Sequence, residues 1–110
     1  MSGDRLHELA EARSLALHQA VAERLREEPE LISTARERVA SWRRSGSVAP
    51  VYAEAWAELL AGDLDALLAA LADPGERARA LRQVTPFAGA IDPRRRWRIW
   101  REARLSFEGR

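Results

Sequence analysis

Hydrophobic residues recur along this chain at the three- and four-residue spacing of one helix face, in stretches that Pro and Gly separate. The longest stretch predicts a helix over residues 4–27, which Pro29 terminates. A second helix is predicted over residues 29–44, with Gly46 as its left-handed C-terminal residue and Trp42 in the core. Apolar and polar residues alternate for no more than a few positions, so the pattern predicts no strand.

Proline and aspartate mark where the next two helices begin. Pro50 is favourable in a first helical turn and predicts a third helix that ends before Gly62. Asp63 predicts the N-cap of a fourth helix over residues 64–72, where leucines form the most hydrophobic stripe of the chain. We expect that stripe in the core.

A capping sequence predicts the fifth helix. Asp73 is placed to act as N-cap, with Pro74 at the first helical position and Glu76 at the third. The helix is expected to continue to about residue 84. The glycine- and proline-containing stretch that follows predicts a loop.

A second Asp-Pro pair, Asp92 and Pro93, predicts the start of the last helix. This helix is expected to run through about residue 105, followed by a short frayed tail from about residue 106.

The predicted fold is all-α, a single compact orthogonal bundle of about six helices. The chain has 110 residues, 46% of them hydrophobic, which is the size and composition of one domain spanning residues 1–110 with one core. A long first helix followed by short, proline-separated helices favours an irregular bundle over an up-and-down one.

Composition excludes several classes of site. The chain has no cysteine, so disulfides, thiolate zinc sites and cysteine nucleophiles are excluded. The longest apolar run, residues 66–72, is too short for a signal peptide or a membrane span, so we expect a cytoplasmic protein without a membrane segment. Phosphate-binding and metal-binding motifs are also missing, and we expect no cofactor and no metal.

Charge is segregated along the chain although its net value is only +1. Residues 1–44 carry eight Arg and eight acids, residues 45–76 carry six acids and no base, and residues 77–110 carry ten Arg and three acids. Such segregation indicates either two surfaces for different partners or two segments that lie against each other, and the second interpretation is favoured. The charges also allow a homodimer joined through these segments.

The last predicted helix is basic and amphipathic. On a helical wheel, Trp97 and Trp100 lie with Ile99 on one side, and most of the arginines lie on the other. Two interpretations stay open: the arginines could bind phosphates, an acidic partner or anionic lipid with Trp at the edge, or the tryptophans could be core anchors beneath a solvated arginine face. The candidate partner-binding residues, including one from the preceding loop, are Phe87, Arg94, Arg95, Trp97, Arg98, Trp100 and Arg101.

Three segments carry a resemblance to other proteins: YAEAW at residues 52–56, DPGERARALRQ at 73–83 and PFAGAIDPRRRW at 86–97. Together they resemble a group of small helical proteins from high-GC bacteria that belong to toxin and antitoxin gene pairs. The exclusive use of Arg as basic residue also indicates a GC-rich bacterial genome. The resemblance covers most of the chain and implies a protein that binds and neutralises a partner encoded beside it, without catalytic residues.

Three classes of function remain. We favour a non-enzymatic protein-binding module, with a nucleic-acid-binding protein that uses the same arginines as the alternative. The third class is a small enzyme with its site near His7 and His18. Glu11, Ser14 and His18 imitate a triad, but working triads converge from separate elements, so solvated helix-face residues explain the pattern better and no catalytic residue is assigned.

Overall fold

The computed structural model describes residues 2–109, with side chains described from residue 4 onward, and over that range it contains six helices and no strand. In chain order they are α1 (Ser2–Glu27), α2 (Leu31–Ser45), α3 (Pro50–Ala61), α4 (Leu64–Ala72), α5 (Glu76–Gln83) and α6 (Pro93–Glu108). The all-α bundle predicted from hydrophobic spacing is confirmed.

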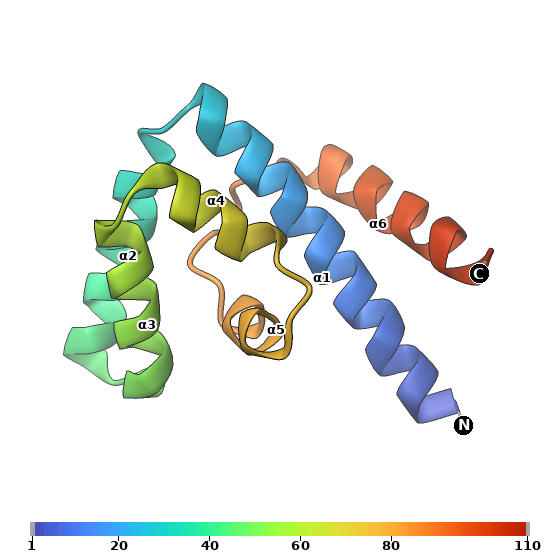
Figure 1. Cartoon of the computed structure of the whole chain (residues 1–110), viewed down its shortest axis with the longest axis horizontal. Helices are drawn as coiled ribbons and strands as arrows, with labels where there is room; N and C mark the ends of the chain where they lie inside the picture. The colour runs from blue at the N-terminus through green and yellow to red at the C-terminus, as the bar shows by residue number, and fades with distance from the viewer. Residues whose placement is uncertain (1, 110) are drawn as a thin grey trace.

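Helix α1 is the element around which the others are arranged (Figure 1). Helices α4 and α5 pack on one side of it and α6 packs on the other, while α2 and α3 pair at the far end. The radius of gyration, 14.3 Å, is somewhat above the value of about 13 Å typical of a domain of this size. The α1–α6 pair extends away from the other helices, which accounts for the elongated shape.

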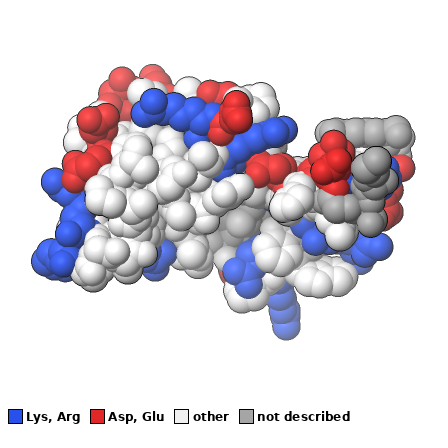
Figure 2. Space-filling model, turned by 90° about the horizontal axis from the view of Figure 1, so that it is seen from below, with Lys and Arg blue, Asp and Glu red and all other residues white. Residues whose placement is uncertain are grey.

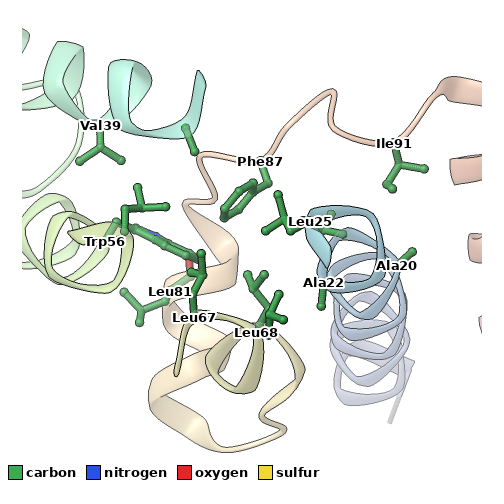
Figure 3. Packing of buried hydrophobic residues seen from close by; sticks show 14 residues of the cluster. Ala20, Ala22, Leu25, Val39, Trp56, Leu67, Leu68, Leu81, Phe87 and Ile91 are labelled. Atoms are coloured by element: carbon green, nitrogen blue, oxygen red, sulfur yellow. The ribbon is translucent and has the colours of Figure 1, made fainter. Parts of the chain in front are cut away.

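Trp56 lies at the centre of the hydrophobic core (Figure 3). Its ring meets that of Phe87 edge-on, with centroids 5.9 Å apart and an interplanar angle of 73°. Its indole N–H donates to the buried carbonyl of Leu81 at 3.1 Å, so the ring contributes hydrophobic area without leaving its polar atom unpaired. Leu25 of α1 and Leu71 of α4 are fully buried and join α1 to the same core.

Aspartates begin two of the helices as predicted. Asp63 Oδ1 accepts from the backbone N–H of Ala66 at 3.0 Å, and Asp92 caps α6 in the same way. The prediction for Asp73 is wrong, because its carboxylate accepts from the N–H of Gly75 at 2.7 Å and forms a turn before the helix. Helix α5 therefore begins two residues later than an Asp73 cap would require.

Two other helix boundaries differ from the prediction. Pro29 lies in a turn, so α2 begins at Leu31. Helix α6 continues to Glu108, and the predicted tail from about residue 106 is wrong. Phe107 is only 9% exposed and lies under the guanidinium of Arg5, 5.1 Å from its ring centroid, so packing against α1 holds the last turn in helical form.

Hydrophobic spacing overestimates burial at the first turns of α1. Leu6 is in phase with Leu17, which packs against the core, but is 66% exposed because this end of α1 projects beyond α4 and α5 (Figure 1). Trp42, expected in the core, is partly buried at its edge. In the part of the chain that the structure describes, no helix is long and apolar enough to span a lipid bilayer.

The loop between α5 and α6 is fixed by arginines from the first two helices. Arg38 of α2 donates through Nη1 to the carbonyls of Pro86 and Ala88, at 3.0 and 2.8 Å. Arg24 of α1 donates to the carbonyl of Ala90. These bonds satisfy backbone acceptors of the loop and hold it against α1 and α2.

Candidate binding face on helix α6

The side of α6 that packs on α1 carries Ile99, Ala103 and Phe107, which recur every four residues and are partly or fully buried. Because this side of α6 faces α1, the two tryptophans of the helix point away from the core. Trp97 is 59% exposed and Trp100 is 37% exposed, so the interpretation of both as core anchors is wrong. Phe107, which lies beyond the predicted end of the helix, extends the packing stripe away from the tryptophans.

Arginines lie over both exposed tryptophans. The guanidinium carbon of Arg101 is 5.1 Å from the ring centroid of Trp97, and that of Arg96 is 5.4 Å from the ring centroid of Trp100. These cation–π contacts join residues one helical turn apart and hold both partners in a defined orientation. The term α6 binding face here means the exposed residues Arg94, Trp97, Arg98, Trp100 and Arg101.

The start of α6 supplies a shallow hollow beside Trp97, lined also by Pro93, Arg94 and Arg98. Asp92 anchors it, since its carboxylate accepts from the N–H of Arg95 at 3.0 Å. That backbone hydrogen bond, together with smaller contributions from the charges of Arg98 and Arg95, lowers the pKa of Asp92 from its usual value. Among residues 4–109, Arg94, Arg98 and Arg101 form no ion pair, so their charges are available to a partner.

Two of the predicted binding residues do not belong to this face. Arg95 is half-buried, and its Nη2 lies 3.7 Å from Oε2 of Glu23 on α1, so it helps to hold α6 in place. Phe87 is 5% exposed and packs against Trp56 in the core, because the loop that carries it folds inward between α1 and α3. The prediction of Phe87 as a partner contact is wrong.

The expectation that the acidic and basic segments lie against each other does not hold for α6. Its ion pairs, within the described residues, run from Arg95 to Glu23 of α1 and from Arg104 to Glu108 in the same helix. Helix α6 is separated from α3 and α4 by α1 (Figure 1). The basic helix and the acidic segment are therefore presented on different sides of the molecule.

A cluster of polar groups around His18 of α1 lies inside the protein. His18 is 2% exposed, and its Nδ1 lies 2.7 Å from the carbonyl oxygen of Ser14 while its Nε2 lies 2.9 Å from Oγ1 of Thr85. Because a carbonyl only accepts, Nδ1 carries the hydrogen and Nε2 accepts from the Thr85 hydroxyl. Burial lowers the pKa of His18 below 6.5, and the charge of Arg82 acts in the same direction against the opposing effect of the Ser14 carbonyl.

This geometry does not assemble the triad that the sequence imitates. His18 is buried and bonded through both nitrogens, which corrects its interpretation as a solvated residue. Ser14 contributes its backbone carbonyl, and Glu11 lies 3.7 Å from Arg79 of α5. His7 is exposed at the far end of α1. Across the described residues, no group of three or more His, Asp or Glu side chains is arranged to hold a metal ion.

The burial of His18 had a signal in the sequence. His18 is in phase with Val21 and Leu25, both fully buried, so the helical spacing places it on the core side of α1. Its partner Thr85 could not be found in this way, because it lies 67 residues further along the chain in a loop.

The α6 binding face is thus the exposed feature with aromatic and basic chemistry, whereas the His18 cluster is internal. Comparison of this chain with protein-family models, curated proteins and solved structures finds no match.

Proposed function

We propose that this protein is a non-enzymatic protein-binding module that uses the α6 binding face to bind a partner protein. The observation that carries the proposal is the exposure of Trp97, 59%, on a helix that packs mainly against α1 on one side. Exposed tryptophan flanked by arginine is uncommon on a solvated helix and typical of the residues that dominate binding energy at protein interfaces.

Charge and shape define the partner. Arg94, Arg98 and Arg101 surround the tryptophans without ion pairs among the described residues, so an acidic surface would bring compensating charge. Trp97 is 59% exposed, so a partner groove that accepts its ring gives the greatest burial. We therefore expect an acidic, concave partner surface.

The proposal is tested by affinity capture of the tagged protein from its native cells, with and without nuclease, followed by mass spectrometry. We expect a stoichiometric protein that survives nuclease treatment. Alanine at Trp97, Trp100, Arg98 or Arg101 is expected to weaken binding by about 2 kcal/mol or more, which is roughly thirtyfold.

Val51→Ala and Arg44→Ala are the matched controls. Val51 on α3 is 69% exposed and Arg44 on α2 is exposed, so they remove one apolar and one basic side chain from elsewhere on the surface. Both variants are expected to bind like the wild type. A partner that binds every α6 variant with unchanged affinity would refute the assignment of this face.

The same exposed arginines support a second candidate function, nucleic-acid binding. Phosphate contacts release counterions, so the logarithm of affinity would fall linearly with the logarithm of salt concentration. Copurified nucleic acid that nuclease removes, together with such a slope, would establish this alternative. Affinity that is insensitive to salt would reject it.

The resemblance to proteins of toxin and antitoxin gene pairs suggests which partner to test first. If the protein is an antitoxin, the product of the adjacent gene copurifies with it, and its expression alone arrests growth. Coexpression of this protein is then expected to restore growth, and coexpression of a Trp97→Ala variant is expected to restore it less well. Equal growth with both forms would show that neutralisation of the partner does not depend on the α6 binding face.

A further inference from the structure

The acidic segment forms a surface opposite in charge to the α6 binding face. All six acids of residues 45–76 are exposed. Within the described chain, Glu54 alone among them forms an ion pair, with Arg43 of α2 at 2.9 Å. These charges lie on α3, on α4, in the turns next to them and, for Glu76, at the start of α5, across α1 from α6.

A groove of about 280 Å³ opens among α3, α4 and α5 on this acidic part of the molecule. Its apolar lining is made of small residues and two leucines: Ala55, Leu59, Gly62, Ala66, Ala70, Ala78 and Leu81. Glu58 and Asp73 line it with Arg77 as the single base. From below, uncharged side chains cover a broad area where α3 and α5 lie, and charged side chains gather along its edges (Figure 2).

The groove is complementary to Trp97 and its neighbours. The small side chains that line the groove leave room for a large apolar side chain. The volume of the groove lies just under the range of small-ligand pockets, which suits one aromatic side chain. Two acids against one base make the rim acidic, and Arg94 and Arg98 lie beside Trp97 in the α6 hollow. The apolar lining of the groove thus matches Trp97, and its acidic rim matches the arginines beside Trp97.

We infer that the α3–α4–α5 groove binds the α6 binding face of a second copy of this chain, with Trp97 in the groove. The inference rests on the proposed function, because it assigns an occupant to the same face. Since α1 separates α6 from the groove, a chain's own α6 does not cover it. The α6 binding face and the groove lie on different sides of the molecule, so one pair of copies makes the contact once and further copies add head to tail.

Self-association follows as a measurable consequence. In sedimentation velocity, the wild-type protein is expected to show a weight-average mass that rises with concentration. Raising the ionic strength from about 0.1 M to about 1 M shortens the screening length from roughly 10 Å to 3 Å and is expected to weaken the assembly. A strictly monomeric protein at every concentration and salt would overturn the inference.

Charge reversal tests the pairing of the two surfaces. Glu58→Arg in the groove and Arg98→Glu on α6 are each expected to weaken self-association at least about tenfold, because each places like charges opposite one another. The double variant restores opposite charges with their positions exchanged and is expected to regain association. Glu37→Arg, which reverses an exposed charge on α2, is the control and is expected to behave as the wild type. Additive loss in the double variant would refute the pairing.

A mixing experiment tests the head-to-tail geometry. Trp97→Ala removes the side chain that enters the groove but leaves the groove itself unchanged. Ala66→Phe fills the groove but leaves the α6 binding face unchanged. Each variant alone is expected to be monomeric, and an equimolar mixture is expected to form a heterodimer that grows no further. A homodimer formed by either variant alone would show an interface that does not use this groove.

The two proposals fail in different ways. Glu58→Arg and Ala66→Phe lie outside the α6 binding face, so their capture of a partner from cells is expected to remain intact while self-association is lost. If partner capture fails in all forms but self-association follows the pattern above, the α6 binding face serves assembly of this chain alone. If capture depends on Trp97 but no variant changes the oligomeric state, only the groove inference is overturned.

Discussion

Buried polar side chains decide how the loop between α5 and α6 sits on the helices. His18 accepts from the hydroxyl of Thr85, whose Oγ1 in turn accepts from the N–H of Phe87 at 3.1 Å. This chain of hydrogen bonds places Phe87 against Trp56 in the core. A proton on Nε2 of His18 would remove the acceptor that Thr85 uses and leave its hydroxyl hydrogen without a partner in a buried site.

We expect stability to depend on pH through His18. Its pKa in the folded protein is below 6.5, so the unfolded chain takes up a proton first as the pH falls. The contribution of His18 to the free energy of unfolding is therefore complete above about pH 6.5 and is lost as the pH falls below that value. Chemical denaturation between about pH 8 and pH 5 measures this slope.

Substitutions of the two histidines test whether His18 causes this pH dependence of the free energy of unfolding. His18→Leu is expected to lower the free energy of unfolding by about 2 kcal/mol, because it leaves Thr85 without its partner, and to flatten the dependence near pH 6. His7→Gln changes an exposed histidine and serves as control. A His18→Leu protein with the wild-type slope would contradict this assignment.

Helix α6 illustrates how tertiary contacts set the rotation and the end of an element. Asp92 and Pro93 predict its first residue correctly, because capping depends on local sequence. Its C-terminal end could not be predicted in this way, since Leu105 and Ser106 give no sign that Phe107 is covered by α1. The local sequence therefore places the start of α6, and packing on α1 places its end.

Phe107→Ala tests this role of packing. We expect a loss of about 3 kcal/mol in the free energy of unfolding and fraying of the last turn, because the ring is 9% exposed and lies against α1. Hydrogen exchange of the amides near residue 107 measures the fraying. Leu105→Ala removes a side chain that is 62% exposed and is expected to change stability little. An equal loss of free energy of unfolding in both variants would contradict the role of Phe107 packing against α1.

The whole molecule consists of a core made by α1 to α5 and one further helix on the outer side of α1. The buried residues of the core cluster come from α1 to α5 and from the loop before α6, and α6 adds the partly buried Ile99. This arrangement leaves the outer side of α6 open to a partner. It also makes α6 a separable contributor to stability.

Removal of residues 93–110 is expected to preserve a cooperative fold. The midpoint of thermal unfolding should fall by more than roughly 10 °C, because the contacts of Ile99 with the core are lost in addition to the roughly 3 kcal/mol from Phe107, while the Trp56 core is kept. Near-ultraviolet circular dichroism reports the Trp56 environment during heating. A truncated chain without a cooperative transition would show that α6 belongs to the core.

The helices, the absence of cysteine chemistry and the segregation of charge all follow from the amino-acid sequence alone. Helical spacing, Pro, Gly and Asp act through neighbours within one turn, so they can be interpreted without knowledge of the fold. The α6 residues Arg94, Trp97, Arg98, Trp100 and Arg101 were also identified from local composition.

Which of these side chains face water depends on contacts between distant parts of the chain. Trp97 is exposed and Phe87 is buried although both are aromatic residues in the same region of the chain, because α1 covers a different side of α6 and the preceding loop folds into the core. The buried Nε2 of His18 has a hydrogen-bond partner only because Thr85, 67 residues away, lies beside it. Contacts between distant segments carry no local pattern, and here they separate the exposed α6 binding face from the internal polar cluster.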